Sequence, residues 1–448
     1  MTRAFEIMLS HTPRLLQEKM RNRFQVPVTP EFQEGEAAML FSDMADFSKI
    51  TEEIAGKNPG DITQLVEMLD TYIGMMTDII LEYGGDIVKF AGDAVFAIWP
   101  VSRNNNIENS LVQALRCGLN LKIKANNFLS QGMALNARIA LGYGSLTVYH
   151  VGGIFGRWEL VFSGEAMIQA TRAGRVAKAG EFVISKEVCA LLDSLNVFHH
   201  NDMKITENQN QESIYIETRE VNKPILYIQD LRQPYIHEPE NEMPLTSAEA
   251  LRAYIPRAIL SEVGDNASSR LADYRPVSVI FLKVCNFDAG KAHDVNYIND
   301  IMQIIQRCLY QYEGSINRFG IDDKGAVLLA AQGLPPLVHD NDPVRAVRTA
   351  FTFRDVFKKN GMDCVIGVGT GSVFCGLVGS EKRNEYTMHG TIVNMTASLM
   401  QASTSILCDQ VTYEATQNEF EYEEAAAIKV KSRIHPIHVY TPVCYIGA

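Results

Sequence analysis

Residues 84–90 read Gly-Gly-Asp-Ile-Val-Lys-Phe, and residues 313–319 read Glu-Gly-Ser-Ile-Asn-Arg-Phe. Two further pairs of similar blocks follow, residues 139–146 with 366–373 and residues 159–164 with 385–390. The three offsets between partners are 229, 227 and 226 residues. A nearly constant offset over three separate blocks predicts two homologous lobes in one chain.

The residues around these blocks predict short buried strands and amphipathic helices. Ala37–Phe41 and Val277–Leu282 are short apolar runs typical of strands, whereas Gln64–Leu81 and Asn109–Phe128 carry apolar residues at helical spacing. Two apolar runs flank residues 91–93 (Ala-Gly-Asp), which predicts a hairpin. This order of elements favours an α+β fold of two ferredoxin-like (βαββαβ) lobes, each with a mixed sheet and helices on one face.

The length of 448 residues fits two domains with additional segments. We expect a helical packing arm over residues 1–33, a first lobe over 34–220, a proline-containing linker over 221–274 and a second lobe over 275–448. The linker also carries an acidic stretch and ends in a helix that leads into the second lobe.

The composition is that of an ordinary globular protein, with 46% hydrophobic and 21% charged residues. The net charge of −12 and the lack of a Lys/Arg block argue against nucleic-acid binding. The N-terminus does not resemble a signal peptide, and no apolar run reaches the roughly 18–20 residues of a membrane span. None of the eight cysteines forms a Cys-x-x-Cys pair, which favours buried free thiols and a cytoplasmic location.

Two aspartates stand where phosphate and metal chemistry is expected. Asp43 ends an apolar strand just before a predicted helix start, where backbone N–H groups attract phosphate. Asp93 lies at the tip of the predicted hairpin. If the strands are neighbours, both carboxylates project from one sheet edge and suit Mg²⁺, which prefers oxygen ligands. The alternative, a helix-capping Asp and a turn Asp, stays open on these patterns.

Five motifs in order, within the duplicated frame, carry a family resemblance. They are residues 41–48 (Phe-Ser-Asp-Met-Ala-Asp-Phe-Ser), 84–94, 371–379 (Gly-Ser-Val-Phe-Cys-Gly-Leu-Val-Gly), 384–387 (Asn-Glu-Tyr-Thr) and 390–394 (Gly-Thr-Ile-Val-Asn). Together they resemble the class III nucleotidyl cyclases, and most closely the tandem catalytic region of bicarbonate-activated soluble adenylyl cyclases. The resemblance covers about residues 35–445.

The resemblance implies an adenylyl cyclase that converts ATP to 3′,5′-cyclic AMP and pyrophosphate at the interface of two lobes paired within one chain. It implies two divalent ions, with Mg²⁺, Mn²⁺ and Ca²⁺ as candidates. The residues it assigns to the metals are Asp43, Met44 and Asp93; the catalytic set is Asp43, Asp93, Arg138 and Asn394; the substrate-binding set is Phe47, Ser48, Arg318, Thr387 and Met388.

A second half-site is expected to be degenerate and to bind an anion. Alignment of the lobes puts Lys283 at the position of the first metal aspartate, and a cation there excludes Mg²⁺. The resemblance implies a bicarbonate activator held by Lys89 and Arg172, although a gap-free alignment puts Thr171 at the arginine position. An ion pair between Lys89 and an acidic neighbour such as Asp86 is the alternative.

Three departures from the family pattern leave other functions open. Asp46 stands where glycine is usual, Arg318 where lysine is usual, and Ser398 where a transition-state arginine is expected. Arg383 is a candidate to replace that arginine. A guanylyl cyclase and a catalytically weak sensor of nucleotide or bicarbonate are therefore the competing hypotheses.

Overall fold

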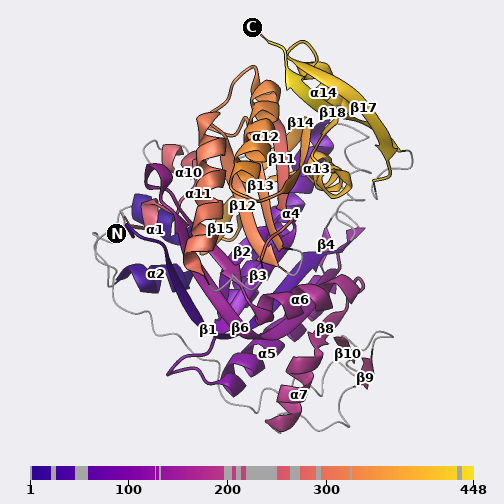
Figure 1. Cartoon of the computed structure of the whole chain (residues 1–448). Helices are drawn as coiled ribbons and strands as arrows, with labels where there is room; N and C mark the ends of the chain where they lie inside the picture. Colours follow the sequence, from indigo (N-terminus) through magenta and orange to yellow (C-terminus); the bar gives the residue numbers. More distant parts are fainter. Residues whose placement is uncertain are drawn as a thin grey trace.

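The structure is a computed structural model that describes residues 3–21, 27–45, 59–126, 128–130, 133–195, 204–207, 213–217, 250–262, 273–288, 294–322, 325–430 and 436–447. These residues form two lobes with the same order of elements (Figure 1). The first lobe runs from indigo to magenta in Figure 1 and the second from orange to yellow.

Two short helices, α1 (Arg3–Ser10) and α2 (Arg14–Arg21), come before the first lobe. That lobe contains β1 (Glu31–Met44), α4 (Pro59–Glu82), β2 (Asp86–Ala91), β3 (Ala94–Pro100), α5 (Ile107–Asn126), β4 (Leu129–Ser130), β5 (Met133–Ala134), β6 (Ala137–Gly152), the 3₁₀ turn η1 (Ile154–Gly156), β7 (Trp158–Ser163), α6 (Glu165–Val176), β8 (Phe182–Ser185), α7 (Lys186–Ser194), β9 (Lys204–Glu207) and β10 (Ser213–Glu217).

The short helix α10 (Arg257–Glu262) precedes the second lobe. That lobe contains β11 (Asp273–Val284), α11 (Val295–Gln311), β12 (Ser315–Asp322), β13 (Gly325–Gln332), α12 (Asp342–Lys359), β14 (Cys364–Gly379), β15 (Asn384–His389), α13 (Thr391–Ala402), β16 (Ile406–Asp409), α14 (Gln410–Thr416), β17 (Phe420–Ile428) and β18 (Ile437–Tyr445).

The two sheets have the same topology. Their strand orders are β2-β3-β1-β6-β8-β10-β9 and β12-β13-β11-β14-β16-β18-β17, with β7 paired to β6 and β15 to β14. The antiparallel core of the first sheet has the order β2-β3-β1-β6, and that of the second has the order β12-β13-β11-β14. In each lobe, one helix follows the first of these strands along the chain and another follows the third. The predicted pair of ferredoxin-like βαββαβ lobes is confirmed.

Helices cover both faces of each sheet, so the prediction of helices on one face is wrong. In the first lobe, α4 and α5 bury one face, with Leu40 and Leu141 in that core. The other face, which carries Met39, packs against α6 through Ala166 and Ala170. The prediction failed because α6 contributes a narrow stripe of small alanines, which binary hydrophobic patterning underestimates.

Close packing of α6 on the sheet depends on a glycine in the repeated Gly-x-Gly segment. A Cβ at Gly142 would lie 2.5 Å from the Ala166 carbonyl oxygen and 2.6 Å from the Ala170 nitrogen. In the second lobe, a Cβ at Gly367 would meet α13 in the same way, 2.5 Å from the Thr396 carbonyl oxygen. These glycines therefore allow a helix backbone to touch a strand backbone.

The lobes pack head to tail, so that a helix of each lobe contacts the hairpin of the other. Helix α4 lies on β14, where a Cβ at Gly74 would be 3.1 Å from the Gly379 carbonyl oxygen. Helix α11 lies on β6 with polar contacts instead. Gln303 donates to the Gly152 carbonyl at 2.9 Å, and Gln306 donates to the Arg157 carbonyl at 3.0 Å.

The N-terminal helices pack between the lobes. Phe5 and Leu16 are buried in a cluster with Val277 and Leu329 of the second sheet. The carboxylate of Asp86 on β2 accepts hydrogen bonds from the backbone N–H groups at the start of α2. The arm therefore contacts both lobes.

The eight cysteines are free thiols; six are buried, whereas Cys285 and Cys444 are exposed. The expectation of buried thiols is thus wrong at two positions, each at or near the end of a strand. No helix in the described part of the chain combines the length and apolar character needed to cross a bilayer.

We expect Gly142→Ala to lower the free energy of unfolding by about 1–3 kcal/mol, because the added methyl group overlaps the backbone of α6. Gly35→Ala is the matched control, since a Cβ there meets nothing within 4 Å. Urea denaturation followed by circular dichroism measures both. Equal stability of the two variants would contradict the packing role of Gly142.

Candidate active site

The two predicted aspartates lie on adjacent strands at one edge of the first sheet. Asp43, near the end of β1, pairs with Arg138 on β6 and with Ala94 on β3. Asp93 occupies the turn between β2 and β3, directly after Gly92, whose φ of 71° favours glycine. The strand order thus brings together two carboxylates that are 50 positions apart in the sequence.

The two carboxyl groups share a hydrogen bond and one cationic neighbour. Arg138 forms an ion pair with Asp43, whose side chain is 15% exposed. Desolvation, together with the charge of Asp43, raises the pKa of Asp93 well above its ordinary value. Desolvation also raises the pKa of Asp43, against the opposing effect of Arg138. The protonated form of Asp93 is therefore favoured, relative to that of an exposed aspartate, when no cation lies between the two carboxyl groups.

This donor set fits Mg²⁺ or Mn²⁺. Such ions are commonly held by one or two carboxylates together with substrate phosphates and water. Two adjacent carboxylates with raised pKa values gain from a divalent cation that replaces the shared proton. Among the described residues, no group of three or more His, Cys, Asp and Glu side chains could hold a metal, so the remaining ligands would have to be substrate, water or backbone oxygens.

Asp43 and Arg138 face a cavity of about 340 Å³ between the lobes. Arg318 on β12 lines the same cavity from the second lobe. The cavity is further lined by Phe41, Phe96, Leu160, Phe162, residues 319–321 and Val327, and by Met167, Thr171, Gly174 and Arg175 of α6. An apolar body with a few cationic and anionic groups at one end is typical of a small-molecule site.

Several predicted residues lie elsewhere or outside the described residues. Met44 has a buried side chain in the first-lobe core, and its backbone N–H bonds to Asp43, so only its carbonyl oxygen is left for a metal. Asp46, Phe47 and Ser48 are outside the described residues.

The second-lobe substrate residues are dispersed. Thr387 and Met388 on β15 are 3% and 2% exposed, and Met388 packs in the hydrophobic cluster below the N-terminal arm. Asn394 lies exposed in the first turn of α13, and the hydroxyl of Ser398 donates to its carbonyl. These four residues are not among the described lining of the Asp43 cavity.

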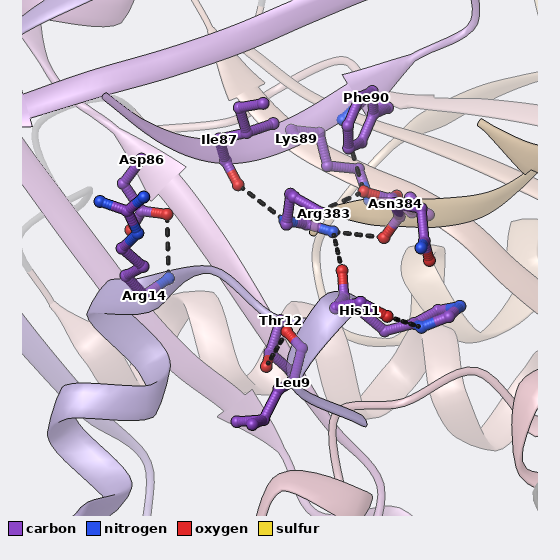
Figure 2. A network of polar contacts seen from close by, with 12 residues as sticks. Leu9, His11, Thr12, Arg14, Asp86, Ile87, Lys89, Phe90, Arg383 and Asn384 are labelled. Atoms are coloured by element: carbon purple, nitrogen blue, oxygen red, sulfur yellow. Dashed lines mark hydrogen bonds and ion pairs between the residues drawn. The ribbon is translucent and has the colours of Figure 1, made fainter. Parts of the chain in front are cut away.

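Lys89 is bound to the second lobe. Its Nζ lies 2.5 Å from Glu385 Oε1, whereas Asp86 bonds to the start of α2 (Figure 2). Lys89 is therefore ion-paired, as the alternative to the anion role held, but its partner is Glu385 and not Asp86. Glu159 also lies close enough to feel the charge of Lys89, so two carboxylates lie near the cation that is predicted to bind an anion.

The predicted pairing of Lys89 with Arg172 is not found. Arg172 is exposed on α6, whereas Thr171 and Arg175, on the adjoining face, line the cavity that Lys89 reaches. One residue along a helix corresponds to a rotation of about 100°, which turns Arg172 away. The gap-free alignment with the family placed Thr171 at this position, and Thr171 is the residue that lines the cavity.

The degenerate half-site has the expected register. Lys283 pairs with Val365, just as Asp43 pairs with Arg138. The second lobe thus lacks both the carboxylate and the arginine of the first. Lys283 is not among the described residues that line either cavity reached by Lys89.

Arg383 does not replace the missing arginine. It is 4% exposed and donates to the carbonyl oxygens of Ile87 at 3.0 Å, Asn384 at 2.5 Å and Ser10 at 3.5 Å (Figure 2). Arg383 is therefore a structural link between the arm and the two lobes.

Tyr72 lies beneath the aspartates and was not among the predicted site residues. Burial and the charges of Asp43 and Asp93 raise its pKa, and its hydroxyl has no hydrogen-bond partner among the described residues. In the sequence, Tyr72 is one of the apolar residues at helical spacing in Gln64–Leu81. The hydroxyl group is a polar contact available to the carboxylate pair.

Comparison with known proteins gives one family over most of the chain. The family model described as the adenylate and guanylate cyclase catalytic domain matches residues 30–218 and 270–443. Adenylate cyclase type 10 of Homo sapiens is 27% identical over 417 residues, which is 87% of this chain but 25% of the human protein. Adenylate cyclase 1 of Rhizobium meliloti is 30% identical over 124 residues, covering 26% of this chain and 17% of that protein.

A solved structure shares the two-lobe fold. A class III adenylyl cyclase-like ATP-binding protein from Pseudomonas aeruginosa superposes with a TM-score of 0.61 at 14% identity, covering 91% of this chain and 94% of that one. This chain spans about a quarter of the length of the type 10 relatives.

We expect Asp93→Asn to raise the melting temperature by several degrees at pH 7.5 in EDTA. A carboxyl group whose pKa is raised by folding stabilises the fold below its unfolded pKa, and this stabilisation is lost as the pH rises through the folded pKa. The advantage of the amide should therefore shrink at pH 5. Added Mg²⁺ should stabilise the parent and not the variant. Differential scanning fluorimetry tests both expectations, and an Asn variant that is less stable at both pH values would refute them.

Proposed function

The chain belongs to the adenylate and guanylate cyclase catalytic domain family, and we propose that it converts ATP to 3′,5′-cyclic AMP and pyrophosphate. The observation that carries the proposal is the meeting of Asp43 and Arg138 of one lobe with Arg318 of the other in a single cavity. The resemblance to proteins named adenylate cyclase favours ATP over GTP.

The aspartates are proposed to hold two divalent ions. Bound ions would lower the pKa of the ribose 3′-hydroxyl and neutralise charge on the triphosphate. Asp43 and Asp93 supply the carboxylates, and their desolvation strengthens the electrostatic interaction with a cation. Arg138, ion-paired with Asp43, is placed to meet phosphate oxygens at the same edge.

The second lobe is proposed to position the base. Arg318 lies across the cavity from Asp43, and its guanidinium has only hydrogen-bond donors, which suit the ring nitrogens of a purine. The apolar walls formed by Phe41, Phe96 and Phe162 exclude water around the substrate. A lobe without its partner would hold only part of this set.

A nucleotide assay tests the activity. Purified chain with Mn²⁺ or Mg²⁺ should form cyclic AMP from ATP in preference to cyclic GMP from GTP. Asp43→Ala should lower turnover by at least about 10³-fold, because it removes a metal ligand needed in the transition state. Asp340→Ala, which removes an exposed carboxylate of the second lobe, is the control.

Cyclic GMP as the main product would identify a guanylyl cyclase. Nucleotide binding without product would identify a sensor. Unchanged turnover in Asp43→Ala would refute the metal assignment.

Bicarbonate stimulation is the second part of the proposal. It rests on the resemblance to bicarbonate-activated cyclases and on the place of Lys89 beside both inter-lobe cavities. Because Lys89 is bound to Glu385, an entering anion has to compete with that carboxylate. Release of Lys89 would change a direct contact between the lobes.

We expect millimolar bicarbonate, against chloride at equal pH and ionic strength, to raise turnover several-fold. Lys89→Ala should remove the response. Glu385→Gln should lower the bicarbonate concentration required, because Lys89 then loses its competing carboxylate. Dose–response curves for the three proteins measure this. Equal stimulation by chloride, or a full response in Lys89→Ala, would rule out the anion role.

A further inference from the structure

A second cavity lies between the lobes under the N-terminal arm. Its volume is about 120 Å³, and among the described residues it shares only Lys89 and Leu160 with the cavity of Asp43. It is lined by residues of both sheets and by two segments that precede the lobes. These segments contribute residues 11–13 and Leu16 of the arm, and Tyr254 and residues 256–258 before the second lobe. We call it the axial cavity.

The axial cavity is built from pseudo-equivalent pairs. Residues 11–16 read His-Thr-Pro-Arg-Leu-Leu, and residues 254–259 read Tyr-Ile-Pro-Arg-Ala-Ile, each ahead of its own lobe. Arg157, just before β7, corresponds to Arg383, just before β15. Glu159 of β7 corresponds to Glu385 of β15, and both offsets are 226 residues. Both members of each of these pairs contribute to the cavity wall.

One half of this arrangement is fully paired. The carboxylate of Asp86 accepts from the backbone N–H groups of Arg14 and Leu15, each at 2.9 Å (Figure 2). Glu385 accepts from Lys89 at 2.5 Å and from the Phe90 N–H at 3.3 Å. Each carboxylate of this half thus has its donors.

The other half lacks these partners. Asp86 corresponds to Ser315, and Arg14 corresponds to Arg257, so a carboxylate is missing beside Arg257. The Arg257 guanidinium lies over the ring of Tyr310 at 5.0 Å and forms no hydrogen bond or ion pair with any described residue. Glu159 is likewise without a hydrogen bond or ion pair from its carboxylate within the described ranges, and burial raises its pKa to about 7.

The arm contributes a buried acceptor to the wall of the same cavity. His11 is 9% exposed, and burial lowers its pKa to about 4, so the ring is neutral. Its Nδ1 lies 2.8 Å from the Ile7 carbonyl and therefore carries the hydrogen. Its Nε2 is then an acceptor, and it has no partner among the described residues.

We propose that the axial cavity binds a small hydroxycarboxylate, with the carboxylate at Arg257 and the hydroxyl at His11. The cavity wall carries four cationic side chains, Lys89, Arg157, Arg257 and Arg383, against the two carboxylates Glu159 and Glu385, which favours an anion. The planar guanidinium of arginine matches a carboxylate with two hydrogen bonds. The ligand supplies the carboxylate that Ser315 lacks.

The chemistry of the ligand can be dissected with three probes of similar size. 3-Hydroxybutyrate carries both groups, butyrate lacks the hydroxyl and butane-1,3-diol lacks the carboxylate. Titration calorimetry and thermal shift of the full chain, in buffer free of bicarbonate and nucleotide, measure binding without reference to cyclase activity. We expect saturable binding of 3-hydroxybutyrate, at least threefold weaker binding of butyrate, and none of the diol.

Variants locate the site. Arg257→Gln should weaken 3-hydroxybutyrate at least tenfold, whereas Arg252→Gln, an exposed arginine of the same segment, should not change it. His11→Phe should abolish the preference over butyrate while leaving butyrate affinity unchanged. If Arg257→Gln is unstable, Arg257→Lys gives the same comparison, with a smaller loss.

Absence of saturable binding, or parental affinity in Arg257→Gln, would overturn the proposal. Binding of butyrate and 3-hydroxybutyrate with equal affinity would overturn the hydroxycarboxylate class. Bicarbonate alone giving an Arg257-dependent shift, with 3-hydroxybutyrate inactive, would also overturn it.

Discussion

Head-to-tail packing of two half-sites is the constraint on which this structure depends. Each lobe contacts its partner through the equivalent helix, α4 in the first lobe and α11 in the second. Side chains from both lobes therefore meet only at the interface. Asp43 and Arg138 belong to the first lobe and Arg318 to the second, yet they line one cavity. Within each lobe, a glycine lets α6 or α13 pack directly against the backbone of its own sheet.

The parts predicted from sequence are those set by local pattern and by repetition. The repeated blocks indicated two lobes, and the apolar runs placed Asp43 and Asp93 on neighbouring strands, because β1 pairs with β3 in this topology. Contacts between lobes were not predictable from pattern. Lys89 and Glu385 are 296 positions apart, and no periodicity relates a strand of one lobe to the hairpin of the other. Arg172 was placed wrongly because a single helical step decides which side chain faces the cavity.

Duplication has left the two halves unequal. Where the first lobe has Asp43 opposite Arg138, the second has Lys283 opposite Val365, so the carboxylate chemistry is confined to one half. The inequality extends to the surroundings of the axial cavity. Asp86 and Glu385 accept hydrogen bonds there, whereas Glu159 and Arg257 have no such partner among the residues that the structure describes. Buried polar groups without partners are costly, which is why such groups point to a ligand more often than paired ones do.

Two equivalent helices contact the opposite lobe in different ways. Helix α11 contacts β6 through hydrogen bonds, and helix α4 contacts β14 through a glycine, so the two contacts differ in how specific they are for their partner. Gln303 and Gln306 donate hydrogen bonds to the backbone of the hairpin that joins β6 to β7, whereas the contact of Gly74 with the Gly379 carbonyl requires only that Gly74 lack a side chain. A hydrogen-bonded contact of this kind discriminates between partners, because a mismatched lobe leaves amide groups buried and unpaired. Two first lobes from different chains would lack this contact, because Gln303 and Gln306 belong to the second lobe. The covalent connection between the lobes raises their local concentration. Together with the hydrogen bonds of Gln303 and Gln306, it favours pairing of a first lobe with a second lobe over pairing of two first lobes.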